Sequence, residues 1–310
     1  HMNKLTKAGF AGLFLSLTAV LASCGSSSET SSDTVAVTAD VFPVTVGELT
    51  LDAQPTRIIS LSPTATEMLY AIGAGSQVVA VDEYSNYPAE AVALGTPLSG
   101  FEPNIEAISG YTPDLVIISY DPGSLVEQLS TLNIPVFVAG AAISIENVYE
   151  QIEQLGVLTG HSQAAIEVSK TLQAGIEEAV ASVQFSEPPL SYYYELDNTY
   201  YSVTSNTFIG QIFNLFGMRN IADNVESGND YPQLSAEVIV SADPDFIFLA
   251  DTKCCAQDAT TVAARDGWGG LKAVTANQVV ELDDDVASRW GPRVLELITA
   301  IRDAVVAANS

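Results

Sequence analysis

Asp285, Arg289 and Arg293 recur at intervals of four residues near the end of the chain. On a helix this spacing makes the side chains neighbours, and an exposed ion pair there contributes only about 0.3–0.5 kcal/mol. Gly291 and Pro292, however, favour a helix that begins after Arg289. Asp285 and Arg289 would then lie in a loop after a strand. A carboxylate acceptor and a forked guanidinium donor in that place predict two anchors for a polar ligand.

Aromatic residues provide a second set of candidate ligand contacts. Tyr84, Phe101 and Tyr120 each fall in a loop of the first half of the chain, after a predicted strand. Singly exposed aromatics are ordinary, but in a parallel sheet the carboxyl ends of the strands meet at one edge, where ligands bind. Three aromatics at that edge predict one wall of a binding site. Residues 198–206, a loop rich in Tyr and hydroxyl groups, are a candidate for the other wall.

The motifs of common enzymes are missing from the sequence. It has no G-x-S-x-G elbow, P-loop or H-E-x-x-H segment. Gly73-Ala74-Gly75 resembles part of a dinucleotide-binding fingerprint, but it follows a predicted helix and precedes a strand. Pyrophosphate binding needs the opposite order, so we reject this motif. The acids are numerous, but none is paired in a recognisable catalytic context. We therefore predict no catalytic residues and a protein that is not an enzyme.

The elements that would position these residues alternate strand and helix. Strands are expected at residues 58–61, 78–81, 115–119 and 134–138, with a helix from Ser62 to Ile72 after the first. Residues 41–51 read as an edge hairpin or strand. A second series follows, with strands at 190–196, 246–249 and 279–282 and a helix at 208–216. This order predicts doubly wound, parallel α/β sheets.

Two helical segments, residues 145–158 and 162–183, separate the two series with no strand between them. The second has about 20 residues and a length of roughly 30 Å, which suits a rigid helix joining two lobes. The alternative is a surface helix of the first lobe. The expected domains are a lobe at 41–143, a helical segment at 144–186 and a lobe at 187–310. The fold class is therefore two α/β lobes joined by a single long helix, with a ligand cleft between them.

A repeated sequence unit indicates that the chain has two lobes with the same structural plan. Glu106 precedes Pro113-Asp114 by seven residues, and Glu237 precedes Pro244-Asp245 by the same interval. Each Pro-Asp pair leads into four apolar residues. Helix–strand joints of this kind are common in α/β folds, so chance is the alternative, but the identical spacing favours duplication of a structural unit.

The first residues read as an export signal. Lys4 and Lys7 precede an apolar run at residues 8–20 that is too short for a comfortable membrane span. Residues 1–23 are therefore interpreted as a signal peptide. The run ends in Leu-Ala-Ser-Cys-Gly, so that Cys24 resembles the lipidated cysteine of a bacterial lipobox; the alternative is an ordinary cleaved signal. Residues 24–40 are predicted to be a flexible linker to the membrane surface.

The net charge and the small number of His and Cys residues argue against nucleic-acid binding and metal binding. The formal net charge of -27 repels nucleic acid, so a nucleic-acid partner is excluded. His1 and His161 are the only histidines, and no metal site is predicted. Cys254 and Cys255 are adjacent; outside the cytoplasm they are free, paired with another molecule, or joined to each other. Their pattern favours a structural or redox-inert role over metal binding.

Five segments of the chain form a distinctive combination: RIISLSPTATEMLYAIGAG, EYSNYP, PNIEAISGYTPDLVI, YPQLSAEVIVSADPDFIFL and DDDVASRWGPR. Together they resemble the substrate-binding lipoproteins of ABC importers for cobalamin and ferric siderophores, the class III periplasmic binding proteins. The similarity covers nearly the whole chain after residue 41, and the cobalamin-binding branch is the nearest.

The resemblance implies roles for particular residues. In the family a glutamate on each lobe docks onto arginines of the membrane permease, and these positions match Glu106 and Glu237. The cleft aromatics of the cobalamin branch match Tyr84, Tyr120, Tyr231 and one of Tyr200 or Tyr201, and its last loop matches Asp285 and Arg289. One departure is that the branch's Trp before the first repeat is replaced near Phe101.

Together these observations predict an extracytoplasmic, lipid-anchored, monomeric binding protein that delivers a corrinoid to an ABC permease, without a cofactor of its own. A ferric siderophore or haem is the alternative cargo, because a tyrosine-rich lining also suits those ligands. A two-lobed α/β enzyme and a ligand-free surface lipoprotein are the rival classes. Turnover assays would test the first, and the clustered loop tyrosines disfavour the second.

Overall fold

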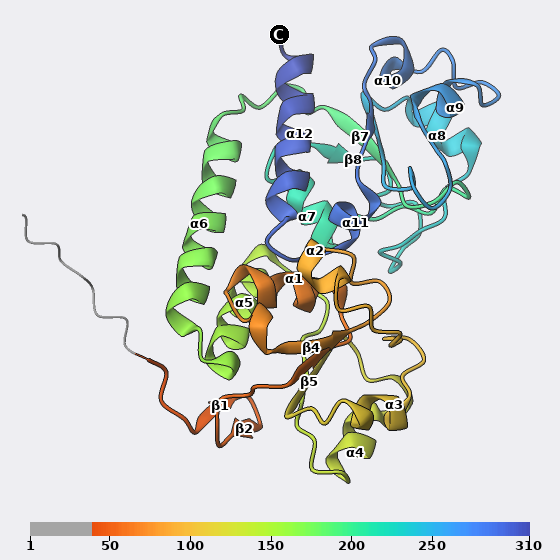
Figure 1. Cartoon of the computed structure of the whole chain (residues 1–310). Coiled ribbons are helices and arrows are strands. Elements are labelled where there is room, and N and C mark those ends of the chain that lie inside the picture. The colour runs from red at the N-terminus through yellow and green to blue at the C-terminus, as the bar shows by residue number, and fades with distance from the viewer. Residues whose placement is uncertain (1–38) are drawn as a thin grey trace, which may run out of the picture. The chain divides into compact units, whose positions relative to one another are not determined.

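The computed structural model describes residues 39–310, so the predicted signal peptide, Cys24 and most of the linker lie outside the described residues. The described chain forms two four-stranded parallel sheets (Figure 1). The first sheet has the order β4-β3-β5-β6. Its strands are β3 (Ile58–Ser60), β4 (Val78–Val81), β5 (Leu115–Ile118) and β6 (Val136–Val138).

Apolar runs covered on both faces produce this parallel arrangement. All four residues of β5 are buried, as are all three of β3. After β3 the chain turns at once into α1 (Pro63–Ala71), where the Ser62 side chain caps the helix by accepting from the Ala65 N–H and Pro63 occupies the first turn. The predicted start of this helix is confirmed. The other helices of this half are α2 (Ala89–Val92), α3 (Ile105–Gly110) and α4 (Leu125–Ser130), with short 3₁₀ turns η1 (Gly75–Gln77) and η2 (Pro122–Ser124).

The residues before the first sheet form the expected hairpin. β1 (Val44–Val46) pairs antiparallel with β2 (Leu49–Leu51). The hairpin packs against α5 (Ile145–Thr159), which is followed by α6 (Ser162–Ala181). The α6 helix, 20 residues long, carries the chain from the first sheet to the second and lies beside the C-terminal helix α12 (Val294–Ala308) (Figure 1).

The second sheet has the order β10-β9-β7-β8 and is also parallel. Its strands are β7 (Ser191–Glu195), β8 (Arg219–Asn220), β9 (Phe246–Leu249) and β10 (Val279–Glu281). The sequence did not predict β8, which is only two residues long. The helices of this half besides α12 are α7 (Phe208–Asn214), α8 (Ala236–Ala242), α9 (Ala259–Ala263), α10 (Lys272–Thr275) and α11 (Asp284–Ser288). The predicted fold class is confirmed.

The two Pro-Asp repeats have a physical explanation in the sheets. The Asp114 carboxylate, just before β5, accepts from the backbone N–H groups of Thr56 and Arg57 at 2.8 and 2.9 Å, just before the neighbouring strand β3. In the second sheet the Asp245 carboxylate accepts from the Ser191 backbone N–H at 2.8 Å, at the start of β7. Each aspartate therefore fixes the amino end of an adjacent strand.

None of the helices among residues 39–310 combines the length and the apolar character needed to cross a membrane.

Candidate ligand-binding cleft

The three predicted aromatics of the first lobe lie together at the carboxyl edge of the first sheet. The Tyr84 and Phe101 ring centroids are 5.7 Å apart in an edge-to-face arrangement, and those of Phe101 and Tyr120 are 6.1 Å apart. Their exposed fractions are 55, 63 and 44%. The three rings line a cavity of about 370 Å³ together with residues 61–64, which connect β3 to α1 and begin that helix. They form an aromatic surface of the kind that accepts a large planar ligand.

Gly100 allows the Phe101 loop to come this close to the sheet. A Cβ atom at position 100 would lie 2.5 Å from the Leu61 backbone oxygen, which neither backbone could tolerate without moving. The loop is placed by this close approach, so Phe101 can reach Tyr84 and Tyr120.

A second cavity, of about 550 Å³, lies at the carboxyl edge of the second sheet. Tyr231 lines it and is 56% exposed. Its apolar lining includes Phe208, Ile209 and Leu196. The two cavities share Asp285, Ser288 and Trp290, at and just after α11. They are therefore adjacent parts of one cleft between the lobes, and α11 forms the boundary between them.

Asp285 is available to both cavities as a polar anchor. Its carboxylate accepts from Asn86 Nδ2 and from Lys253 Nζ, both at 3.0 Å, and lies 3.4 Å from Arg289 Nη2. Partial burial opposes ionisation, but the hydrogen bonds from Asn86 and Lys253 outweigh it and hold the pKa of Asp285 below its ordinary value. The side chain is an ionised acceptor at neutral pH. Asp285 was expected to lie in a loop, but it lies in the first turn of the short helix α11.

Arg289 lines the first cavity, but its terminal nitrogens are engaged by protein groups. Nη1 donates to Glu67 Oε1 and to Asn86 Oδ1, both at 2.8 Å, and Nη2 donates to the Tyr84 backbone oxygen at 3.0 Å. The residue is only 7% exposed. These contacts hold the guanidinium against Glu67, Asn86 and the Tyr84 backbone, and they compete with the predicted role of Arg289 as a forked donor to the ligand, which stays a prediction.

Sequence reasoning missed Glu67 as the centre of this arrangement. Its Oε1 atom also accepts from Arg293 Nη2 at 2.6 Å and from Arg293 Nε at 3.2 Å. Glu67 comes from α1 of the first lobe, whereas both arginines follow α11 of the second. We call these three residues the Glu67 ion cluster. The only sequence signal was an acid among the apolar residues of α1, in a chain with few arginines.

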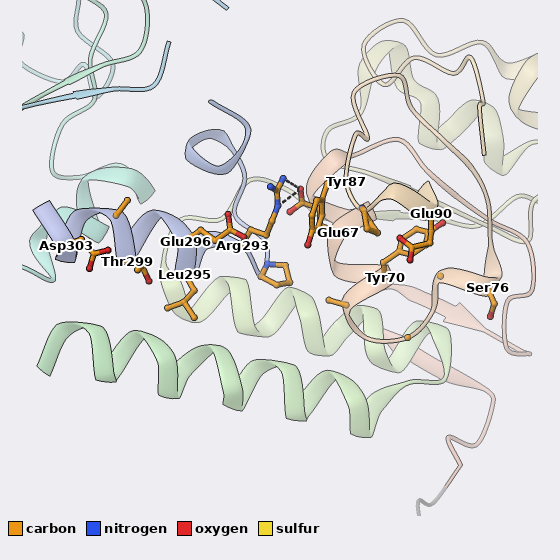
Figure 2. Close-up of a pocket in the computed structure, with 16 residues that line it drawn as sticks. Glu67, Tyr70, Ser76, Tyr87, Glu90, Arg293, Leu295, Glu296, Thr299 and Asp303 are labelled. Atoms are coloured by element: carbon orange, nitrogen blue, oxygen red, sulfur yellow. Dashed lines mark hydrogen bonds and ion pairs between the residues drawn. The ribbon is translucent and has the colours of Figure 1, made fainter. Parts of the chain in front are cut away.

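The Glu67 ion cluster separates the cleft from a groove of about 1200 Å³ between α1, α2 and α12. In Figure 2, Arg293 reaches Glu67 from the start of α12 and lies beside Tyr87. The guanidinium carbon of Arg293 is 4.0 Å from the centroid of the Tyr87 ring. None of the predicted ligand-binding residues lines this groove. We therefore assign the candidate site to the cleft at the carboxyl edges and not to this larger groove.

Tyr200 and Tyr201 line neither of the two cleft cavities. The Tyr200 backbone has φ of 72°, and its ring stacks on Trp268 with centroids 5.6 Å apart and on the Arg265 guanidinium. Tyr201 is 41% exposed and forms an isolated antiparallel bridge with Gln233. The prediction that one of them contacts the ligand is not supported, because the left-handed turn directs Tyr200 to a different cluster.

Glu106 and Glu237 occupy equivalent places in the two lobes. Each is exposed and lies in the first turn of its helix, α3 and α8. The caps are also equivalent: Asn104 Oδ1 accepts from the Ala107 N–H, and Ser235 Oγ accepts from the Val238 N–H. A carboxylate in the first turn is favoured by the helix dipole. Both glutamates are accessible to a basic partner.

Of the three states left open for the adjacent cysteines, the structure has the disulfide between Cys254 and Cys255. The loop that contains it follows β9, and Lys253 and Cys254 line the second cavity.

A buried acidic pair lies behind this loop. Arg265 donates to both carboxylate oxygens of Glu195, at 2.7 and 2.6 Å. Asp251 is fully buried, and neither of its carboxyl oxygens has a hydrogen-bond partner among the described residues. Burial, with a contribution from the charge of Glu195, raises the pKa of Asp251 to about 8. Asp251 therefore carries a proton at neutral pH.

Comparison with known proteins agrees with this architecture. Residues 58–286 match the family described as "Periplasmic binding protein". An uncharacterized ABC transporter substrate-binding lipoprotein of Bacillus subtilis is 28% identical, over 96% of this chain and 97% of its own. A cobalamin-binding protein of Halobacterium salinarum is 32% identical, over 85% of this chain and 74% of its own. The crystal structure of the periplasmic vitamin B12 binding protein of Vibrio cholerae superposes with a TM-score of 0.69 at 27% identity, over 83% of this chain and 98% of that one.

The chain belongs to the Periplasmic binding protein family. Within it, the chain is a two-lobed, extracytoplasmic substrate-binding protein of an ABC importer, and not an enzyme. A membrane permease and a small-molecule ligand are the partners of such proteins.

Proposed function

We propose that this protein captures a corrinoid in the cleft and delivers it to the permease of its importer. The observation that carries the proposal is the aromatic wall of Tyr84, Phe101 and Tyr120, with Tyr231 in the adjoining cavity. The similarity to a cobalamin-binding protein supports the choice of ligand.

The chemistry of a corrinoid suits such a cleft. A corrin is a wide, nearly planar macrocycle with amide groups around its edge. Its faces gain from contact with aromatic rings, while a few polar groups fix its orientation. Asp285 is the acceptor that would take an amide N–H, since its carboxylate is ionised and reaches both cavities. The corrinoid is cargo; we propose that the protein needs no resident cofactor and no metal of its own.

The two equivalent glutamates suggest where the permease would dock on this protein. We propose that Glu106 and Glu237 pair with arginines of the permease, one on each lobe. Their exposure and matched helix positions support this role. Charged pairs of this kind orient docking and speed encounter. We further propose that the protein is a monomer held to the outer face of the cytoplasmic membrane through lipid on Cys24.

Titration with cyanocobalamin and with dicyanocobinamide tests the ligand assignment, with tyrosine and tryptophan fluorescence as the signal. We expect saturable quenching at micromolar concentrations or below. A parallel thermal-shift panel includes haem and ferric siderophores. A flat corrinoid titration, combined with a shift by haem or a ferric siderophore, would replace the corrinoid by that cargo and leave the importer role intact.

A further inference from the structure

The disulfide loop is an integral part of the second cavity. Cys254 is exposed and lines that cavity beside Lys253, and Tyr231 lines the same space. A disulfide presents a soft, polarizable surface without a strong hydrogen-bond donor, and sulfur makes favourable contacts with aromatic and planar groups. The Cys254–Cys255 pair therefore offers the cleft a type of surface that the tyrosines do not.

The backbone of the loop is held closely by α11. The Asp284 carboxylate accepts from the backbone N–H groups of Thr252, Lys253 and Cys254, at 2.9, 3.0 and 2.9 Å. Asp284 directly precedes Asp285, the acidic residue shared by the two cavities. The loop backbone is therefore tied directly to the helix that forms the boundary between the cavities.

The far side of the loop is fixed as well. The N–H groups of Cys255 and Gln257 donate to the Asp251 backbone oxygen, both at 3.3 Å, and Gln257 Nε2 donates to the Cys255 oxygen at 2.8 Å. Between them Ala256 has φ of 52°, in the left-handed region that a residue with a Cβ rarely adopts. Such a conformation persists only where its surroundings enforce it. A covalent bond between adjacent side chains, which restricts the backbone of both cysteines, is one such constraint.

We propose that the Cys254–Cys255 disulfide is a ligand-contacting element of the cleft, and that its reduction by a thiol weakens ligand binding. In the reduction two thiol groups of the reductant give two electrons and two protons. The sulfur–sulfur bond breaks, two cysteine thiols form, and the reductant leaves as its own disulfide. Reduction removes the covalent constraint on the backbone of Cys254 and Cys255, directly before the turn at Ala256. It also replaces the disulfide at the cavity wall, which Cys254 lines, by two separate thiols. The ligand identity used in the test rests on the proposed corrinoid function, but the contact itself does not.

The test measures binding in both redox states of the full chain. The protein is reduced, freed of reductant without air, and titrated with cyanocobalamin, while alkylation and mass spectrometry verify the new thiols. We expect the dissociation constant to rise about three- to ten-fold, as when an ordered loop must be reordered on binding. The Cys254→Ser/Cys255→Ser variant, passed through the same treatment, should bind like the reduced protein and show no further change.

The reciprocal measurement tests the coupling between ligand and disulfide independently of the binding titration. If reduction weakens binding, linkage requires that bound ligand makes the disulfide harder to reduce. The fraction reduced in glutathione redox buffers is therefore measured with and without saturating cyanocobalamin, and should be lower with it. Equal dissociation constants for the oxidised and verified reduced protein, or no effect of ligand on reduction, would overturn the inference. If the oxidised protein binds no corrinoid, the proposed cargo is wrong; the same two measurements are then made with whichever of haem or ferric siderophore shifts the melting temperature, and decide the inference there.

Discussion

Glu67 Oε1 and Arg289 Nη1 are 2.8 Å apart, although 222 positions separate the two residues in the chain. The contact joins a helix of the first lobe to the end of α11 in the second, in an environment where the Glu67 side chain is 1% exposed and that of Arg289 is 8% exposed. Arg293 completes the cluster on the same carboxylate oxygen. The relative position of the cleft walls therefore depends on a buried charge cluster as well as on α6.

Replacement of Glu67 by Gln should destabilise the protein markedly. The substitution removes the charge that the buried Arg289 shares with the partly buried Arg293 and leaves Arg289 with the more distant Asp285 at 3.4 Å. Breaking a buried ion pair from one side costs about 3–5 kcal/mol. The free energy of unfolding in urea measures the loss. Glu90→Gln removes an exposed acid from the rim of the same groove and serves as the control, with an expected change within about 0.5 kcal/mol. Equal stabilities of the two variants would show that the cluster does not hold the lobes.

Replacing a cleft aromatic should mainly weaken ligand binding, whereas replacing Tyr200 should mainly lower the stability of the protein. Tyr231→Ala is expected to weaken cyanocobalamin binding about ten-fold, or about 1.4 kcal/mol, because it removes an exposed aromatic contact. Tyr200→Ala should leave binding unchanged and lower the free energy of unfolding by about 1–2 kcal/mol, since its ring stacks on Trp268. Isothermal titration and urea unfolding measure the two quantities. The reverse pattern would place Tyr200 in the site.

Charge reversal at the two exposed glutamates should affect transport and not capture. In Glu106→Lys/Glu237→Lys we expect ligand affinity within about two-fold of the original and loss of permease-dependent uptake, because like charges then face the permease arginines. Glu167→Lys/Glu177→Lys on α6 makes the same change in net charge at exposed positions and should transport normally. Loss of ligand binding in the first variant would instead assign these glutamates to the binding site.

The buried acid Asp251 should impose a pH dependence on stability. Its pKa of about 8 in the folded protein lies above the ordinary value of 3.8, so the folded state retains a proton that the unfolded chain releases. Stability from this group is therefore present below about pH 4 and is lost as the pH rises toward 8. In Asp251→Asn the side chain keeps nearly the same shape but has no group that titrates. Relative to the original protein it should gain at least about 1 kcal/mol between about pH 5 and pH 9.

Urea unfolding at several pH values checks this prediction. Asp266→Asn changes an exposed acid in the same lobe and should track the original protein at every pH within about 0.5 kcal/mol. A difference between Asp251→Asn and the original protein that does not vary with pH would contradict a proton held by Asp251.

Much of the fold could be predicted because its signals are local. Apolar runs bounded by Pro-Asp predicted β5 and β9, and Ser62 with Pro63 predicted the start of α1. The alternation of strands and helices then placed Tyr84 and Tyr120 at one edge, since parallel strands end together. These inferences need only sequence neighbours and one rule of topology.

The site contacts that were missed depend on distant partners or on side-chain direction. The four-residue spacing of Asp285 and Arg289 allowed a helical ion pair, which we set aside for a loop with two ligand anchors, yet the pair is present at 3.4 Å. Nothing near either residue indicated Glu67. The place of the Tyr200 ring, outside the lining of both cavities, could not be predicted because its backbone conformation and Trp268, far along the chain, decide where it points. The state of the two cysteines depends on oxidation, which the order of residues does not encode.

The aspartates of the two repeats have a consequence for redesign. Asp114 and Asp245 tie together the amino ends of neighbouring strands, while the cleft is built from loops at the opposite, carboxyl ends. The preceding helices carry Glu106 and Glu237 at the same interval from these aspartates. Grafting new carboxyl-end loops onto this scaffold would therefore alter the cargo and leave the spacing of the two carboxylates proposed for docking intact. Under that proposal one permease would accept a series of receptors with different specificities.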